Sequence, residues 1–313
     1  MASASGTKKS KQASTPPVVD TPAPVPRRRL WLSPALWLGT IVLTVLLIGA
    51  YWVPRHLPDL TDAPEYQVRL NEILVSPPPA WVPAALPTQI RENADLPESV
   101  SLLQPQLCRT LALAWEESPW VQQVRSVQIT RDRKIQIDVV YRVPVAFVQV
   151  PGGLYPVDES GILLPPSDFT SADTTRLPLV RGIQTVPQGA AGELWGDPQV
   201  IAAASLAAVL MPEQNLETYW HHYQFVAIHV VTTPAEADHP ELLQLELETA
   251  RGSRVVWGQP PGSGPLEPSP AVKLARLQDY VNRFGGLDGP LGPQRIDIRL
   301  FDGISLRPLP ARY

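Results

Sequence analysis

The chain has 313 residues, of which 44% are hydrophobic and 18% charged, and its formal net charge is −4. This balance excludes a chain that is disordered throughout and a protein that crosses a membrane many times. A single cysteine, Cys108, excludes an intramolecular disulfide and a zinc site built from four cysteines. We expect Cys108 to pack as a small apolar residue on a helix.

The first 29 residues are rich in Ser, Ala, Pro and Lys and predict a disordered tail. The tail ends in three basic residues, Arg27, Arg28 and Arg29. An apolar run follows from Leu30 to Val53, 24 residues without a formal charge. About 20 apolar residues suffice to cross a bilayer as a helix. Signal peptides have apolar regions of about 7–15 residues, so the run predicts an uncleaved transmembrane helix.

Charges on the two sides of this run predict the orientation of the chain. The tail holds six basic residues against one acidic residue, and the rest of the chain holds 20 basic and 29 acidic residues. Basic residues beside a span stay in the cytoplasm. We therefore expect the N-terminus inside and the C-terminal body outside the plasma membrane. An acidic body is also a poor partner for nucleic acid.

After a short Pro-containing linker (54–65), residues 66–145 predict a small α+β module. A strand-like run at 66–75 is interrupted by the prolines of 77–87. Apolar residues at helical spacing then predict a helix, which ends at Ser118-Pro119. Two alternating runs joined by the charged turn 131–134 predict a hairpin. The predicted helix has an apolar stripe made of Leu103, Leu107, Leu111 and Ala114.

Residues 146–313 predict a larger domain of strands with two helices. The first helix has Asp197 at its cap and Pro198 at its first position. Ser269 is expected to cap the second helix, Pro270 to open it and Gly285 to end it. The chain closes with the alternating segment 295–301, a turn at Asp302-Gly303 and a resumed alternation at Ile304 and Leu306. The stripe of the second helix contains Leu274, Leu277, Val281 and Phe284.

The predicted fold class is therefore α+β. It consists of an N-terminal transmembrane helix, a small α+β module, and a larger mixed or antiparallel sheet with helices on one side.

Five strings along residues 66–308 carry a resemblance to a known family. They are SPWVQQVRSVQITRDRKIQIDVVYRVPVAF (118–147), LYPVDESGILL (154–164), LPLVRG (177–182), RGSRVVWGQ (251–259) and RIDIRLFDGISLR (295–307). In this order they resemble segments of FtsQ and DivIB, a family of bacterial cell-division proteins. The chain departs from the family pattern at Pro77-Pro78-Pro79, where a Val-x-Gly ending is usual, and at Tyr141-Arg142, where a Glu-led pair is frequent.

The resemblance implies that residues 66–145 form a POTRA module and residues 146–313 a β domain. It further implies a non-catalytic scaffold of the divisome, in the inner membrane, that acts in septation. The implied partners are small coiled-coil division proteins similar to FtsB and FtsL, with further divisome proteins on the POTRA module. Another POTRA-containing envelope protein, active in assembly or secretion, is the main alternative.

An exposed sheet edge can accept a strand from another chain, because its N–H and C=O groups have no neighbour. In the resembling family the terminal strand is such a docking edge. Phe301 stands directly before a turn, where solvent is expected, and this fits a partner surface. The alternative is that the strand is covered and has no partner. Carried over by position, the candidate partner-binding residues are Arg299, Leu300, Phe301, Asp302, Gly303 and Ile304.

No sequence signature of common enzymes is present. GxSxG, GxxxxGK[ST], GxGxxG and HExxH are all missing, so we expect no catalysis, no cofactor and no metal. An anchored envelope enzyme remains a less favoured alternative, which predicts polar groups converging around His221 and Asp158. We expect Asp158 and Glu159 to be solvated turn residues. The His residues 221, 222, 229 and 239 are expected at the surface or at an interface. Trp115, Trp120, Trp195, Trp220 and Trp257 are expected in the core or at a domain interface.

Overall fold

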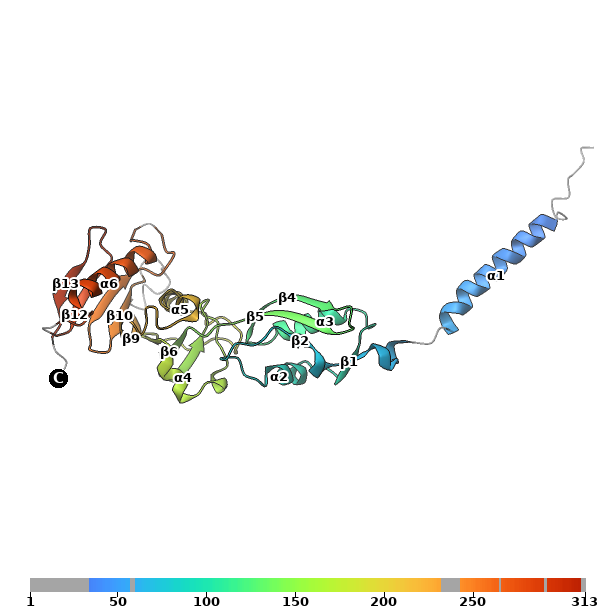
Figure 1. The fold of residues 1–313 in the computed structure, drawn as a ribbon, viewed down its shortest axis with the longest axis horizontal. Helices are drawn as coiled ribbons and strands as arrows, with labels where there is room; N and C mark the ends of the chain where they lie inside the picture. The colour runs from blue at the N-terminus through green and yellow to red at the C-terminus, as the bar shows by residue number, and fades with distance from the viewer. Residues whose placement is uncertain (1–33, 57–59, 232–242, 265, 290–291, 311–313) are drawn as a thin grey trace, which may run out of the picture. The chain divides into compact units, whose positions relative to one another are not determined.

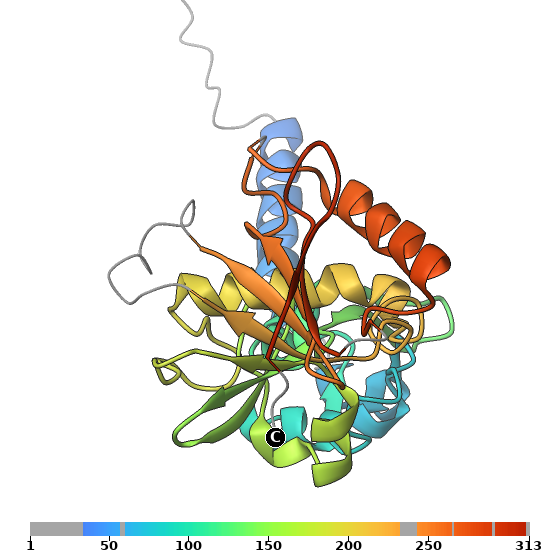
Figure 2. The ribbon, with the colours of Figure 1, turned by 90° about the vertical axis from the view of Figure 1, so that its left-hand side faces the viewer.

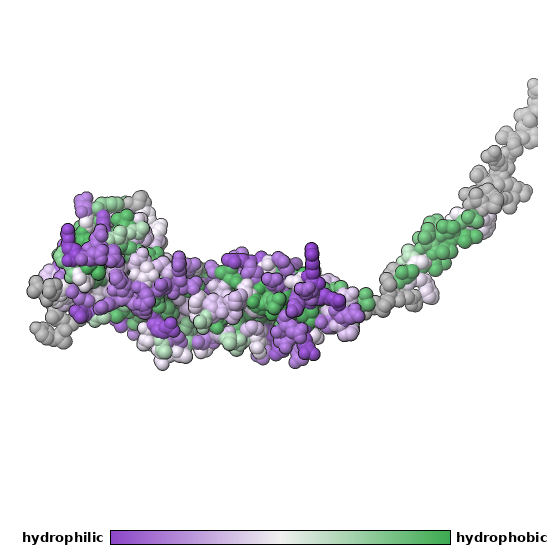
Figure 3. All heavy atoms as spheres, in the orientation of Figure 1, coloured by the Kyte–Doolittle hydropathy of each residue, from purple (hydrophilic) through white to green (hydrophobic). Residues whose placement is uncertain are grey.

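The computed structural model describes residues 34–56, 60–231, 243–264, 266–289 and 292–310. The chain divides into two compact units, Met1–Asp59 and Leu60–Tyr313. The first contains one described helix, α1 (Pro34–His56), whose described large apolar side chains are each more than half exposed (Figure 3). No helix among the described residues is long and apolar enough to span a membrane. Residues 30–33 of the expected span and the basic residues 27–29 lie outside the described ranges.

The second unit begins with a small module, residues 60–145. Its three-stranded sheet has the order β2 (Leu74–Val75), β5 (Ile135–Tyr141), β4 (Val121–Ile129), and β4 and β5 form the predicted antiparallel hairpin. A two-stranded sheet joins β1 (Gln67–Arg69) to β3 (Ser99–Ser101). The helices are α2 (Leu86–Asn93) and α3 (Leu107–Glu116), and short 3-10 turns lie at Leu60–Asp62, Pro64–Tyr66 and Leu70–Glu72.

Three details of the small module differ from the sequence predictions. The run 66–75 is two short strands, because β1 pairs with β3 and β2 pairs with β5, and a 3-10 turn carries the chain between these partners. The predicted helix begins at Leu107, so the exposed Leu103 lies outside it, in a turn closed by the Gln104 N–H on the Ser101 carbonyl. Helix α2 was not predicted; Leu86 and Ile90, four residues apart, are its buried side chains.

The β domain, residues 146–310, is built on one eight-stranded mixed sheet (Figures 1 and 2). Three of its strand pairs are parallel, β6–β8, β8–β9 and β11–β12. In spatial order the strands are β13 (Ser305–Pro308), β12 (Gln294–Asp297), β11 (Arg254–Gly258), β10 (Leu245–Thr249), β9 (Phe225–Val230), β8 (Leu179–Arg181), β6 (Ala146–Val150) and β7 (Gly153–Val157).

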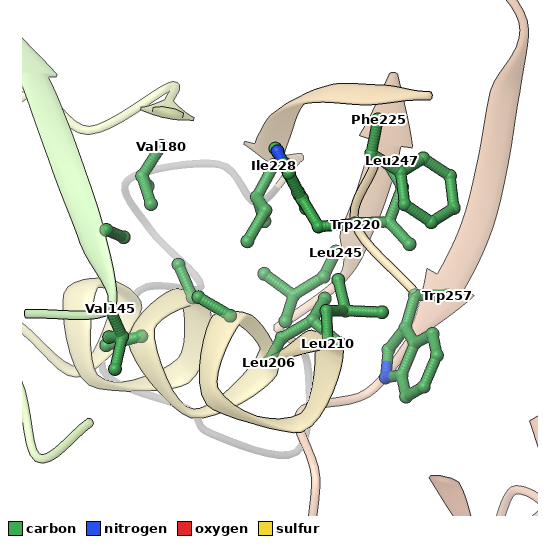
Figure 4. Close-up of a cluster of buried hydrophobic side chains, with 14 of the residues drawn as sticks. Val145, Val180, Leu206, Leu210, Trp220, Phe225, Ile228, Leu245, Leu247 and Trp257 are labelled. Atoms are coloured by element: carbon green, nitrogen blue, oxygen red, sulfur yellow. The ribbon is translucent and has the colours of Figure 1, made fainter. Parts of the chain in front are cut away.

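One face of this sheet carries the core. Helices α5 (Pro198–Leu210) and α6 (Pro270–Phe284) bury side chains in the same apolar cluster as the sheet, which confirms helices on one side. Figure 4 shows Leu206 and Leu210 of α5 turned towards the strands. A short helix α4 (Ser171–Arg176) and 3-10 turns at Pro166–Asp168 and Pro212–Gln214 complete the domain.

The helix ends mostly agree with the sequence. Asp197 caps α5 by accepting the Gln199 N–H at 2.8 Å, and Gly285 ends α6 with φ of 80°. Ser269 occupies the N-cap position of α6 as predicted, but its side chain makes no capping hydrogen bond. Phe284 is exposed and does not belong to the core stripe, so that part of the prediction is wrong.

Candidate docking site

The terminal strand β13 is the last strand on one side of the eight-stranded sheet. Among the described residues it pairs only with β12, in an antiparallel register that sets Leu306 opposite Ile296 and Arg307 opposite Arg295. The closing segment is thus two strands rather than one, and β13 covers the edge of β12. The outer side of β13 is a sheet edge of the kind that accepts a further strand.

A continuous row of apolar side chains runs across the core face of the sheet and ends at Leu306. Neighbouring members are register partners on successive strands. The first six are completely buried, whereas Leu306 is 45% exposed. The sheet surface that the helices cover therefore continues onto an uncovered edge. In spatial order the row is Val148, Val180, Ile228, Leu247, Val255, Ile296 and Leu306.

A groove of about 780 Å³ lies between α6 and β13. Its apolar wall contains Phe284, Ile304 and Leu306, and its polar rim contains Arg276 and Arg283. The groove is open at the surface, beside the strand edge. An incoming strand on β13 would place alternate side chains over it, as strand addition requires. The full lining is Arg276, Asp279, Tyr280, Asn282, Arg283, Phe284, Ile304 and Leu306.

The candidate residues 299–304 lie in the connection between β12 and β13, not on a strand. Phe301 is 65% exposed, as expected for a residue before a turn. Leu300 is exposed as well, although the alternation had placed it on the buried face with Ile296 and Ile298, because the strand ends at Asp297. Gly303 has φ of 149°, which favours glycine. Ile304 is half-buried against the core cluster and lines the groove. Leu300, Phe301 and Ile304 thus lie in the connection just before the edge strand, whereas Leu306 lies on the edge strand itself.

Arg299 and Asp297 form the charged part of this connection. The Arg299 Nη2 donates to Asp297 Oδ2 at 2.7 Å, its Nε donates to Oδ1 at 3.0 Å, and its Nη1 donates to Gln244 Oε1 at 3.1 Å. Burial alone would raise the pKa of the Asp297 carboxyl, but the hydrogen bonds and charge of Arg299 outweigh it and hold the pKa below its ordinary value. Arg299 therefore acts first as a structural partner of β12.

The opposite edge of the sheet, strand β7, is less able to accept a further strand. Strand β7 contains Pro156, which has no N–H to offer a new strand. Its last residue, Val157, is already bridged to Leu163, and the Leu164 N–H donates to the Pro156 carbonyl. Strand β13 also contains a proline, Pro308 at its end, but its exposed apolar side chain Leu306 lines a groove, and its outer side pairs with no other described segment.

The two residues named for an enzyme site, Asp158 and His221, have different partners. Asp158 is 3% exposed: it binds the Arg142 guanidinium at 2.8 Å and accepts the N–H groups of Ser160 and Ile162. The solvated-turn prediction is thus wrong for Asp158, because the turn folds onto Arg142, and it holds for the exposed Glu159. His221 is paired with Glu217 in another part of the domain.

The remaining histidines and tryptophans take separate positions. His222 is exposed, His229 is half-buried against Glu248 at 2.6 Å, and His239 lies outside the described residues. Within the described ranges no group of three or more His, Cys, Asp or Glu side chains is placed to hold a metal ion. All five tryptophans are buried, as expected for residues of the core or of a domain interface. Cys108 lies on α3 and is half-buried.

No protein-family model matches the chain, and no curated protein is similar to it. The sequence singles out the connection 299–304 but gives no sign of the groove. Phe284 is predicted for the apolar stripe of α6, and no prediction concerns Tyr280. The resumed alternation at Ile304 and Leu306 was the one signal for a final edge strand.

Proposed function

We propose that this chain is a non-catalytic, membrane-anchored scaffold that holds a partner protein by strand addition at β13. The observation that carries the proposal is Leu306: it continues a completely buried apolar row onto an exposed strand edge beside an apolar groove. A partner strand would satisfy the backbone of β13 and cover Leu306. A partner side chain or helix would fill the groove against Phe284.

The proposed anchor is the segment Leu30–Val53, which includes residues outside the described range. Its support is the charge-free sequence and the exposure of the large apolar side chains along α1. Such a surface needs an apolar environment. The basic residues at 27–29 would keep the N-terminus in the cytoplasm, which would place the small module and the β domain on the outer side of the inner membrane.

The proposed setting is the cell-division machinery, and its support is the resemblance to FtsQ and DivIB over residues 66–308. The partners at β13 would be small coiled-coil membrane proteins similar to FtsB and FtsL. The small module would act as a POTRA module and bind further divisome proteins. No cofactor is needed for this role, since the binding groups are backbone amides and apolar side chains.

Depletion of the protein in its own host tests this setting. The proposal predicts filaments in which septation is blocked, rescued by the wild-type chain. Leu306→Lys should fail to rescue, because it places a charge where the partner strand covers an apolar residue. Leu154→Lys, at the opposite edge, should rescue. Normal septation on depletion would reject the divisome role and favour the alternative of an envelope assembly or secretion protein.

A further inference from the structure

Arg276 holds the connection between β12 and β13 from the facing side of α6. Its guanidinium donates to three backbone carbonyls of this connection, those of Ile298 at 3.3 Å, Leu300, and Phe301 at 2.6 Å. The Arg276 side chain is half-buried, and it also lines the groove beside β13. One residue of the helix thus fixes the backbone that carries both exposed apolar side chains of the connection.

The connection has few other attachments among the described residues. The Ile298 N–H donates to the Val256 carbonyl at 3.4 Å, and the Arg299 side chain donates to Asp297 and Gln244. Ile304 packs against the core at the other end. Leu300 and Phe301, between these points, belong to no strand and bury little of their side chains. The planar guanidinium has five N–H donors in a fixed fork, so a single Arg can hold several carbonyls that a Lys ammonium cannot match in geometry.

We infer that Arg276 is the positioning residue of the docking site. It orders the connection so that Leu300 and Phe301 are presented to the partner in one arrangement before the partner arrives. This inference rests on the proposed function and deepens it. A loop ordered in advance loses less conformational freedom on binding, which strengthens capture without adding a contact to the partner.

Arg283 offers a matched control on the same helix. It is exposed, lines the same groove and carries the same charge, but the structure records no hydrogen bond from it to the connection. Arg276→Met and Arg283→Met each remove one positive charge from the groove and keep an apolar stem of similar length. Only the first removes the hydrogen bonds to the three carbonyls.

The test uses the full chain in detergent micelles and measures hydrogen exchange of the Ile298 and Arg299 amides, whose N–H groups donate hydrogen bonds at the start of the connection. Arg276→Met should speed this exchange by about tenfold or more, and Arg283→Met should leave it unchanged. Arg276→Lys keeps the charge and should give an intermediate rate. Exchange in the middle of α6 should stay slow in all three variants, which excludes unfolding of the helix as the cause.

A second measurement, the yield of a photo-cross-link, tests whether the order of the connection affects partner binding. A photoreactive residue at position 306 of the full chain in its native membrane should give an adduct with a small coiled-coil membrane protein. Arg276→Met should reduce the adduct yield, and Arg283→Met should not. Unchanged exchange, or faster exchange with full adduct yield, would overturn the role of Arg276 alone. A wild-type chain without an adduct would overturn the proposed function together with this inference.

Discussion

Lys273 is a charged side chain buried at the first turn of α6. It is 2% exposed, and its ammonium donates to the Trp257 carbonyl at 2.7 Å and to Glu267 Oε2 at 2.6 Å. The same Glu267 oxygen accepts the Gln259 N–H at 3.0 Å, so the pair connects α6, the end of β11 and the loop between them. Burial lowers the pKa of Lys273, while Glu267 opposes this shift.

Lys273→Ala should destabilise the chain by about 3–5 kcal/mol, because it leaves the Glu267 carboxylate in a largely buried place without its cation. Denaturant unfolding measures this loss. Adding Glu267→Gln to Lys273→Ala should recover part of it, since the buried negative charge is then removed. Equal losses in the single and double variants would contradict a coupled pair.

His229 and Glu248 lie on the sheet face opposite the helices, where Arg181 and Arg254 also contact Glu248. Burial lowers the pKa of His229, and the two arginines add to this, against the hydrogen bond with Glu248. Burial would raise the pKa of Glu248, but His229 and the arginines outweigh it and lower the pKa. Both groups thus bind protons less readily in the folded chain than in the unfolded chain.

The sign of both shifts predicts loss of stability in acid. The contribution of His229 to the free energy of unfolding is fully present above its ordinary pKa of about 6.5. It is lost as the pH falls through the pKa that His229 has in the folded chain. The Glu248 contribution is lost in the same way below about 4.5. Denaturant unfolding across pH should show that His229→Gln removes the loss of stability near pH 6.5 and reduces the loss below about pH 4.5, because His229 is one of the groups that lower the pKa of Glu248. An unchanged profile would contradict this assignment.

At the level of single residues, the sequence predicted exposure better than it predicted pairing. Phe301 before a turn was expected to face solvent and does, because local chain direction decides its exposure. The burial of Lys273 was missed, since its partners Trp257 and Glu267 come from other segments. Asp158 was misjudged for the same reason: its cation, Arg142, belongs to the end of the preceding module.

At the level of elements, the strands with strong alternation and the helices with clear ends could be predicted. The hairpin 121–141 and helix α5 depend on local pattern and caps. Helix α2 was missed because prolines surround it, although Pro87 is tolerated in its first turn. The division of 66–75 into two strands depends on which neighbours pair with each half, and a one-dimensional pattern does not contain this information.

Gly182, directly after β8, allows the backbone there to approach the end of β9 closely. It has φ of 97°, and a Cβ atom there would lie 2.5 Å from the Val230 carbonyl oxygen of the neighbouring segment. Gly182→Ala should therefore cost about 1–3 kcal/mol through backbone strain and separation of β8 from β9. Gly286→Ala is the control, because a Cβ there meets nothing within 4 Å. Denaturant unfolding should separate the two variants, and equal stability would contradict the close approach.

At the level of the whole molecule, the small module and the β domain share side chains. Leu164 of the β domain is completely buried in the core cluster of the small module. Phe169 lies 5.6 Å from the Trp120 ring and 5.4 Å from the Phe147 ring, between centroids. The Trp120 indole donates to Asp168 at 2.8 Å. Residues 60–310 should behave as one cooperative unit, as their assignment to a single compact unit suggests.

Calorimetry of the full chain in detergent should show one unfolding transition for these residues. Phe169→Ala should lower and broaden it, at a cost below the ~3–5 kcal/mol of a fully buried Phe, because Phe169 is half-buried. Leu113→Ala, on an exposed side of α3, should change the transition little. Two separate transitions in the wild-type chain would show that the shared side chains do not couple the modules.

Cross-linking in the native membrane is the first test of β13 as a docking edge. A photoreactive residue replaces Leu306 in one full chain and Leu154, at the opposite edge, in another. We expect an adduct with a small coiled-coil membrane protein from position 306 and none from position 154. No adduct at 306, or equal adducts at both positions, would contradict it.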